Sequence, residues 1–301
     1  MTDSRSPDKP LVSILLVTAN RADHLDAPID SVLAQTETRW ELIAVDCGST
    51  DGTLERLEAW ASDERIRVIS VEETNRAIGR REALGRAKGA FVAFLDPQTV
   101  WPTGFLETLA GRFAELPDRT GVMYARTEIA DEEGHPQRML PPERHHGSMV
   151  QELFEQPCFP LSALMIRHTA VRPLEKTGKG PVLANDHTLL LWLAHRTPFE
   201  PAPEALDPIR IHRIDGALPL ILDSVSEQRE EAMNYALEHF TGAVPARFAR
   251  RSLASFHNAR ARALAAGGDS GEALTQALRA LMYRPLWPRA WRQVLRIAVR
   301  G

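Results

Sequence analysis

Three carboxylates stand beside apolar segments, and residues of this type could hold a cation, bind a sugar hydroxyl or accept a proton. Asp46 follows the apolar run WELIAV, Asp96 follows AFVAFL, and Asp186 precedes HTLLLWLA. Acidic residues at the carboxyl ends of buried parallel strands lie where α/β folds place ligand chemistry. This placement indicates a nucleotide-type ligand rather than a structural protein.

An alternation of strands and helices must hold these carboxylates in place. Four apolar strands are expected, at 11–17, 40–46, 66–71 and 90–96. Helical patterns separate them, near 22–35, 51–60 and 76–88. Because the strands are continuously apolar, this order predicts a mainly parallel α/β sheet with helices on both faces.

The pattern changes after Gly121. Two short strands around a turn at Glu133 and Gly134 are expected, followed by a strand at 159–167, a helix at 183–196 and one edge strand at 208–213. Only helices are expected after Leu218, at 220–240, 246–266, 270–283 and 286–299. The sequence therefore predicts a flexible arm at 1–10, an α/β domain at 11–216 and a helical domain at 217–301.

Composition favours a cytoplasmic globular enzyme. The chain has 301 residues, of which 44% are hydrophobic and 25% charged. No run reaches the roughly 20 apolar residues of a membrane-spanning helix, and the polar start is unlike a signal peptide. Only Cys47 and Cys158 are present, so neither a disulfide framework nor a zinc pattern is expected.

The charge is unevenly distributed. Residues 245–301 contain eleven arginines, no lysine and two acidic residues, a net charge of +9, which leaves 25 basic and 38 acidic residues, or −13, in the remainder. The segment 286–299 forms a broad apolar helical face with arginines beside it. Such a helix could lie on an anionic membrane surface, or its apolar face could pack on the preceding helix. Nucleic acid is not an expected partner, because no recognised motif accompanies the arginines.

Four motifs, in order, resemble family 2 glycosyltransferases with the GT-A fold. They are VSILLVTANR with SVLAQ, AVDCGSTDGT, GRREALGRAKGAFVAFLDPQT and NDHTLLLWLA. The resemblance covers about two thirds of the chain, and each motif alone would be a weak signal. It implies transfer of a sugar from a nucleotide-diphosphate donor, with a UDP-sugar expected, to an acceptor hydroxyl or amine, usually with inversion. The acceptor could be a saccharide, a lipid-linked molecule, a protein or a small molecule.

The resemblance also implies roles for particular residues. Asp186 matches the general base, and the alternative is a carboxylate that caps the helix, together with Asn185. Asp96 matches the residue that holds Mn²⁺ or Mg²⁺, and the alternative is a cap on the following turn. Asp46 matches a contact to the base and ribose, or else caps the turn through Ser49.

Further residues complete the implied donor site. Thr18 and Ala19 stand in the loop that cradles the base, and Gln98 stands in the metal motif. Arg80 could pair with the diphosphate, or be a solvated helix arginine. His212 could supply a metal ligand or a phosphate contact, whereas His187 is expected to be structural.

Several positions depart from the family pattern. Ala19 replaces the usual tyrosine, Cys47 replaces the second acid after the second strand, and Asn185 replaces the glutamate before the base. Gln98 and Thr99 replace the later acids of the metal motif, and hard cations prefer anionic oxygen ligands. Three outcomes are open: an enzyme that binds its metal weakly, a metal-independent enzyme that uses Arg80 or Arg81, or an inactive binding or scaffold protein. The survival of all three carboxylates favours activity.

Overall fold

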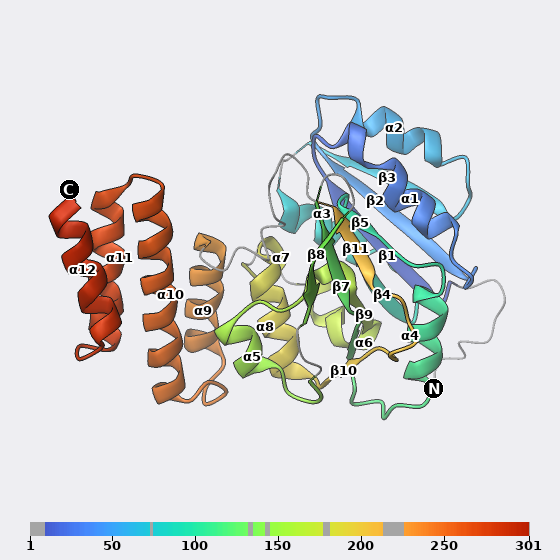
Figure 1. The fold of residues 1–301 in the computed structure, drawn as a ribbon. Helices are drawn as coiled ribbons and strands as arrows, with labels where there is room; N and C mark the ends of the chain where they lie inside the picture. Colours follow the sequence, from blue (N-terminus) through green and yellow to red (C-terminus); the bar gives the residue numbers. More distant parts are fainter. Residues whose placement is uncertain are drawn as a thin grey trace.

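The structure is a computed structural model that describes residues 10–72, 75–131, 135–141, 145–176, 181–212 and 226–300. It is an α/β fold with two sheets, followed by a region of helices (Figure 1). The expected domain boundary near residue 216, nearly all of the expected arm and the turn at Glu133 and Gly134 lie outside the described residues.

A seven-stranded sheet forms the centre of the fold. Its strands, in spatial order, are β10 (Phe199–Pro201), β6 (Val122–Tyr124), β9 (Leu164–Arg167), β4 (Phe91–Leu95), β1 (Val12–Thr18), β2 (Trp40–Cys47) and β3 (Ile66–Val71). All pairings are parallel except those of β9 with β4 and β6. Every residue of β2 and β4 is buried, so both faces of the central sheet are covered, as their continuous apolar sequences predict.

Helices flank this sheet. They are α1 (Asp26–Leu33), α2 (Thr53–Trp60), α3 (Arg76–Leu84), α4 (Phe105–Phe113), α5 (Val150–Glu155), α6 (His168–Val171), α7 (Pro181–Ala184) and α8 (Asp186–Arg196), with short 3₁₀ turns at Ala22–His24, Leu161–Ala163 and Arg172–Lys176. Helix α3 lies close to β1 and β2, because a Cβ on Gly79 would come within 2.6 Å of Val17 and 2.7 Å of Cys47. A larger residue at position 79 would push α3 away from the strand ends that carry the expected site.

A second sheet joins segments that are far apart in the sequence. Its strands, in spatial order, are β5 (Thr99–Val100), β11 (Ile209–His212), β7 (Thr127–Ala130) and β8 (Pro136–Leu140). The expected antiparallel pair around Glu133 is confirmed as β7 and β8. The expectation that 208–213 forms an edge strand is wrong, because β11 lies between β5 and β7.

The remaining helices form a row beside α5 and α8 (Figure 1). They are α9 (Glu227–His239), α10 (Ala246–Ala266), α11 (Ser270–Tyr283) and α12 (Pro288–Arg300). Apolar residues of α9 and the first half of α10 belong to the same core cluster as the central sheet. Among the described residues, every helix is too short or too polar to cross a membrane.

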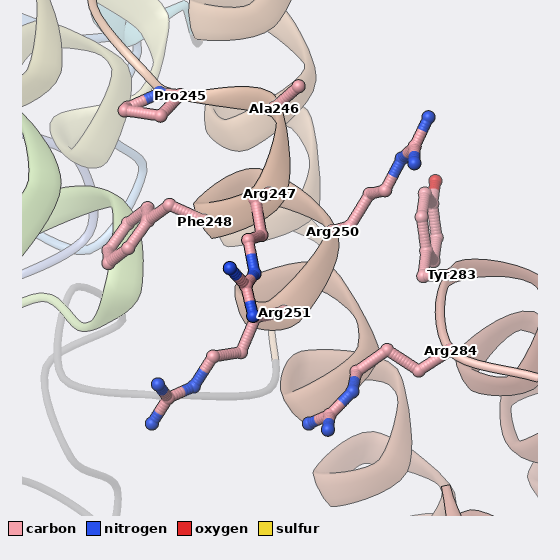
Figure 2. Close-up of a pocket in the computed structure, with 8 residues that line it drawn as sticks. All are labelled: Pro245, Ala246, Arg247, Phe248, Arg250, Arg251, Tyr283 and Arg284. Carbon is pink, nitrogen blue, oxygen red and sulfur yellow. The ribbon is translucent and has the colours of Figure 1, made fainter. Parts of the chain in front are cut away.

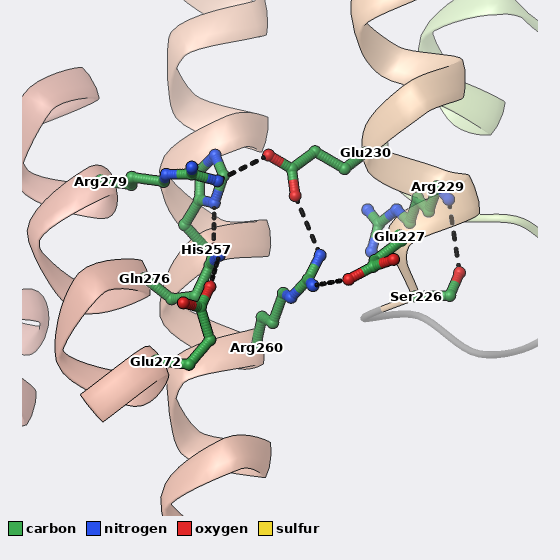
Figure 3. A network of polar contacts seen from close by, with 9 residues as sticks. All are labelled: Ser226, Glu227, Arg229, Glu230, His257, Arg260, Glu272, Gln276 and Arg279. Carbon is green, nitrogen blue, oxygen red and sulfur yellow. Dashed lines mark hydrogen bonds and ion pairs between the residues drawn. The ribbon is translucent and has the colours of Figure 1, made fainter. Parts of the chain in front are cut away.

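A polar network holds α9, α10 and α11 together (Figure 3). Glu230 on α9 pairs with Arg260 on α10 at 2.9 Å and with Arg279 on α11 at 3.1 Å. His257 Nδ1 lies 2.7 Å from Gln276 Oε1, and burial lowers the pKa of His257. Apolar residues also pack between α10 and α11. The polar pairs add specific contacts, which favour one way of packing the three helices.

Candidate functional site

The carboxyl ends of three parallel strands meet at one edge of the central sheet. Thr18, the last residue of β1, lies opposite Asp46 of β2, and Leu95, the last residue of β4, lies opposite Leu16 of β1. Asp96 follows Leu95 directly, so Thr18, Asp46 and Asp96 share this edge, as the sequence predicts.

The loop after β1 is bonded to the loop after β2. Asn20 adopts a left-handed conformation with φ +53°, and its Oδ1 accepts a hydrogen bond from Thr50 N at 2.9 Å. Its own backbone N donates to Ser49 Oγ, also at 2.9 Å. These bonds hold together two loops that are about 30 residues apart in the sequence. Asn20 was not among the residues predicted from the sequence, although an asparagine before a turn is a signal for a left-handed position.

Asp46 is only 1% exposed, and both of its carboxylate oxygens accept hydrogen bonds from Ser49. The turn-capping role considered for it is therefore present in this structure. Thr18 differs, because its Oγ1 is buried and has no hydrogen-bond partner among the described residues. Several other buried hydroxyls, such as that of Thr127, also lack a partner among the described residues.

Asp186 and Arg80 form an ion pair at this site. The guanidinium of Arg80 bonds to Oδ1 of Asp186, and its other terminal nitrogen donates to the Leu183 carbonyl at 3.0 Å. Arg76, one turn earlier on α3, lies 3.5 Å from the same carboxylate oxygen. Arg80 is 6% exposed, so the expectation of a solvated helix arginine is excluded for it.

Asp186 does not cap α8, because Asn185 takes that role. The Asn185 Oδ1 accepts hydrogen bonds from the backbone N atoms of His187 and Thr188, at 3.0 and 3.1 Å. Its Nδ2 donates to the Gln228 carbonyl of α9 at 2.7 Å. The amide that replaces the family's glutamate therefore joins α8 to the helical region and leaves the Asp186 carboxylate for the arginines.

The two carboxylates near Arg80 have opposite pKa shifts. Burial would raise the pKa of Asp186, but the positive charges of Arg80 and Arg76 outweigh it and the pKa is lowered. Burial raises the pKa of Asp96, and the negative charge of Asp186 adds to that rise, against the hydrogen bond from Gln98 N. Titratable groups with divergent shifts at one site are typical of functional clusters.

The expected metal ligands are brought together but do not form a complete metal cage. The backbone N of His212 donates to the Gln98 carbonyl at 2.9 Å, which places His212 next to the segment that carries Asp96 and Gln98. Asp96 Oδ1 accepts a hydrogen bond from Gln98 N at 2.9 Å, so the turn-capping role considered for Asp96 is also present. Within the described ranges, no group of three His, Cys, Asp or Glu residues could hold a metal ion. One carboxylate, one amide and one imidazole fit a cation only if diphosphate oxygens complete its shell.

Three further positions have structural roles. Cys47 is buried against α3, and burial raises the pKa of its thiol, so this position packs a helix instead of offering a charge. Arg81 pairs with its neighbour Glu82 at 3.3 Å. His187 is buried with Nε2 2.7 Å from the Leu153 carbonyl, and burial lowers its pKa to about 4, as expected for a structural histidine.

One side of the last helix, α12, is packed against its neighbour, and another side is exposed to solvent. Ala290 and Ile297 are buried against α11, with Trp287 and Val294 partly buried beside them. An exposed row of apolar residues lies beside this packed stripe: Leu286, Trp291, Leu295 and Val299. One apolar stripe of the helix thus packs on its neighbour, whereas the adjacent stripe faces solvent.

The chain is similar to several known proteins. The sequence profile described as "Glycosyl transferase family 2" matches residues 13–172, just over half of the chain. TuaG of Bacillus subtilis (strain 168), named as a candidate teichuronic acid biosynthesis glycosyltransferase, is 44% identical over 101 residues, which are 33% of this chain and 40% of TuaG. WfgD of Escherichia coli, named as a UDP-Glc:alpha-D-GlcNAc-diphosphoundecaprenol beta-1,3-glucosyltransferase, is 37% identical over 123 residues, which are 40% of this chain and 47% of WfgD. The chain thus spans less than half the length of each of these relatives.

Solved structures share the fold. S. aureus TarS 1-349 in complex with UDP-GlcNAc has a TM-score of 0.64 and 16% identity, over 95% of this chain and 88% of that one. The mannosyltransferase PcManGT from Pyrobaculum calidifontis, in complex with GDP-Man and Mn²⁺, has a TM-score of 0.51 and 18% identity, over 97% of this chain and 87% of that one. At these identities the likeness extends to the fold, and that fold includes the helices after the sheet.

Proposed function

The chain belongs to glycosyl transferase family 2, and on that premise we propose that it transfers a sugar from a nucleotide-diphosphate donor to an acceptor hydroxyl or amine, with inversion. The observation that carries this proposal is the Asp186 carboxylate, held by Arg80 and Arg76 beside Asp96. Burial alone would raise the pKa of this carboxylate, and the two arginines reverse that effect, so Asp186 is in the ionised form that can accept a proton.

In the proposed reaction, Asp186 removes the proton of the acceptor hydroxyl as that oxygen attacks the anomeric carbon. The bond between this carbon and the donor diphosphate breaks, and the nucleoside diphosphate leaves with the electron pair. Arg80 is already bonded to Asp186 and Leu183, so we assign it to positioning the base instead of binding the diphosphate. Arg76 is more exposed, and its charge acts to lower the pKa of both Asp186 and Asp96.

For the donor, we propose that Thr18, Ala19 and Asp46 contact the nucleoside. The position of Thr18 opposite Asp46, at the carboxyl ends of adjacent parallel strands, supports this assignment. A UDP-sugar is the preferred candidate, since WfgD is named for UDP-Glc and TarS 1-349 was solved with UDP-GlcNAc.

The diphosphate is proposed to lie beside Asp96 and Gln98. A divalent cation there would neutralise charge on the leaving group, with Asp96, Gln98 and His212 as candidate holders. Burial raises the pKa of Asp96, so a cation would favour its ionised form. Because only one candidate holder is a carboxylate, we expect Mn²⁺ or Mg²⁺ to bind weakly to the protein alone and more tightly together with the nucleotide.

A lipid-linked acceptor is proposed, with contact between the exposed stripe of α12 and the inner face of the membrane. The arginines beside that stripe support contact with an anionic surface, and WfgD is named for a diphosphoundecaprenol acceptor.

Calorimetric titration of UDP-GlcNAc, UDP-Glc and GDP-Man, with and without Mn²⁺, tests the donor assignment. We expect a UDP-sugar to bind, with an affinity roughly tenfold higher when Mn²⁺ is present, because the cation offsets the charge of the diphosphate. Absence of binding under every condition would contradict the proposal and favour an inactive scaffold, whereas sugar transfer to any acceptor would exclude a scaffold.

A further inference from the structure

An open pocket of about 1000 Å³ lies on the helical region, where the first turns of α10 meet the end of α11 (Figure 2). Four arginines line it: Arg247, Arg250, Arg251 and Arg284. Tyr283 forms part of the wall next to Arg284. Since all lining residues belong to α10, α11 and the residues beside them, the pocket is distinct from the candidate donor site.

In the part of the chain that the structure describes, the pocket arginines have no acidic partner. Among the described residues, none of the four forms an ion pair with a carboxylate, and the first turn of α10 contains no acidic residue. Other arginines of the same helices behave differently, because Arg260 and Arg279 pair with carboxylates of α9 (Figure 3). Four exposed guanidinium groups around one hollow therefore attract an anion, and their planar donor forks match phosphate.

Exposed apolar side chains lie at the turn that adjoins the pocket. Met282 is 79% exposed and Leu286 is 92% exposed, and these residues flank Tyr283 and Arg284. Trp291 is half exposed, and its Nε1 donates to the Pro285 carbonyl of the same turn at 2.7 Å. Large apolar residues exposed beside cationic ones are typical of surfaces that meet the boundary between lipid headgroups and acyl chains.

The pocket is fixed to the rest of the molecule. Phe248, on its wall, packs against Phe154 of α5, with ring centroids 6.4 Å apart. Tyr283 stacks on His257 of α10 at 5.6 Å. A ligand in this pocket would therefore be held in a defined orientation relative to the α/β part of the chain.

We propose that this pocket binds the phosphate group of an anionic lipid, while the turn with Met282 and Leu286 enters the membrane boundary. The inference deepens the proposed membrane contact and rests on it: attachment would depend on a defined phosphate site and not only on the total positive charge. Polar atoms of the headgroup meet the guanidinium groups, and the exposed apolar residues meet the lipid chains.

Co-sedimentation of the full chain with vesicles of phosphatidylcholine, with and without about 30% phosphatidylglycerol, tests the proposal. A variant with Arg250→Gln, Arg251→Gln and Arg284→Gln removes three pocket charges. Its matched control removes three exposed charges outside both the pocket and α12, through Arg86→Gln, Arg112→Gln and Arg262→Gln. We expect the pocket variant to lose roughly tenfold or more in affinity for the anionic vesicles, and the control to lose less than about threefold.

Equal losses for the two variants would overturn the pocket assignment in favour of diffuse attraction. The lipid assignment would be overturned if the protein bound glycerol 3-phosphate in solution as tightly as it binds anionic vesicles. It would also be overturned if the protein bound neutral and anionic vesicles equally well. Titration of UDP into the same variants shows whether the donor site is intact. A variant that loses vesicle binding but keeps its affinity for UDP has its defect in the pocket. Thermal melting checks that each variant is folded.

Discussion

Arg80 and Asp186 lie 106 residues apart in the sequence and form a charge-assisted contact between α3 and the first turn of α8. The contact sets both the position and the ionisation of the carboxylate, because the arginine charge outweighs the effect of burial on the pKa. The chemistry proposed for Asp186 therefore depends on α3, the helix that lies against β1 and β2.

Asp186→Asn is expected to lower turnover by roughly 100-fold or more, because an amide cannot accept the acceptor's proton. Affinity for the donor should change less than about threefold, since the amide oxygen can still bond to Arg80. Steady-state kinetics and calorimetry measure the two quantities. Asp118→Asn is the matched control on an exposed residue. Turnover that survives in Asp186→Asn would remove this residue from the role of base.

Arg80→Met is expected to move the acidic limb of the pH profile of kcat to higher pH. Removal of the cation raises the pKa of Asp186, so the base becomes protonated at a higher pH than in the native chain. Unfolding should become easier by roughly 3 kcal/mol, because one member of a buried pair is lost.

Arg80→Lys keeps the positive charge, so it should shift the acidic limb of the pH profile less than Arg80→Met does. This variant provides a readout if Arg80→Met folds poorly. Arg86→Met, on an exposed arginine of the same segment, should leave the profile unchanged. An unaltered limb in both Arg80 variants would contradict electrostatic control of Asp186 by Arg80.

Thr18→Val is expected to weaken nucleotide binding by about tenfold without loss of stability. The valine has the same shape and removes a buried hydroxyl that lacks a partner, so the free energy of unfolding should stay level or rise by up to about 1 kcal/mol. Thr127→Val removes a similar unpaired hydroxyl on β7 and is the matched control. If both variants bind UDP like the native chain, Thr18 does not contact the nucleotide.

Gln98→Asp is expected to tighten Mn²⁺ binding by roughly tenfold or more in the presence of UDP, because it adds an anionic oxygen next to Asp96. Titration of Mn²⁺ into the UDP-saturated protein measures the change, and Gln151→Asp on the exposed side of α5 supplies the same charge elsewhere. An equal gain in the two variants would indicate a general charge effect and contradict a cation site at Asp96.

Acidification from about pH 6.5 toward pH 4 is expected to destabilise the fold through His187. Its pKa is lowered to about 4 by burial, so the unfolded chain, with a pKa near 6.5, binds the proton first and stability falls as pH falls. The contribution is at most about 3 kcal/mol. His187→Gln should flatten the dependence of the melting temperature on pH in this interval. A slope identical to that of the native chain would show that other groups cause the loss.

The central sheet could be predicted from the sequence because its strands are buried on both faces and therefore read as continuous apolar runs. The second sheet could not, since β5 has two residues and pairs with β11, more than one hundred residues later. The position of β11 between β5 and β7 depends on those distant pairings and not on any property of the segment PIRIHR.

The carboxylates of the site could be named from their positions after strands and before a helix. Their partners could not, because the bond between Arg80 and Asp186 joins helices that are distant in sequence. Arg76 was missed, although its spacing of four residues from Arg80 places both on one face of α3. The role of Asn185 was open in the sequence, since either Asn185 or Asp186 could cap the helix.

The amide of Asn185 connects the helical region with the residue proposed as the base. Its oxygen caps the start of α8, whereas its nitrogen is bonded to α9. A single side chain thus connects two helices that both lie beyond the family's matched segment, residues 13–172. A chimaera that exchanged the C-terminal helices would therefore also remove the α9 partner of Asn185, next to the proposed base. The proposed membrane contact and the proposed chemistry are thus joined through one side chain.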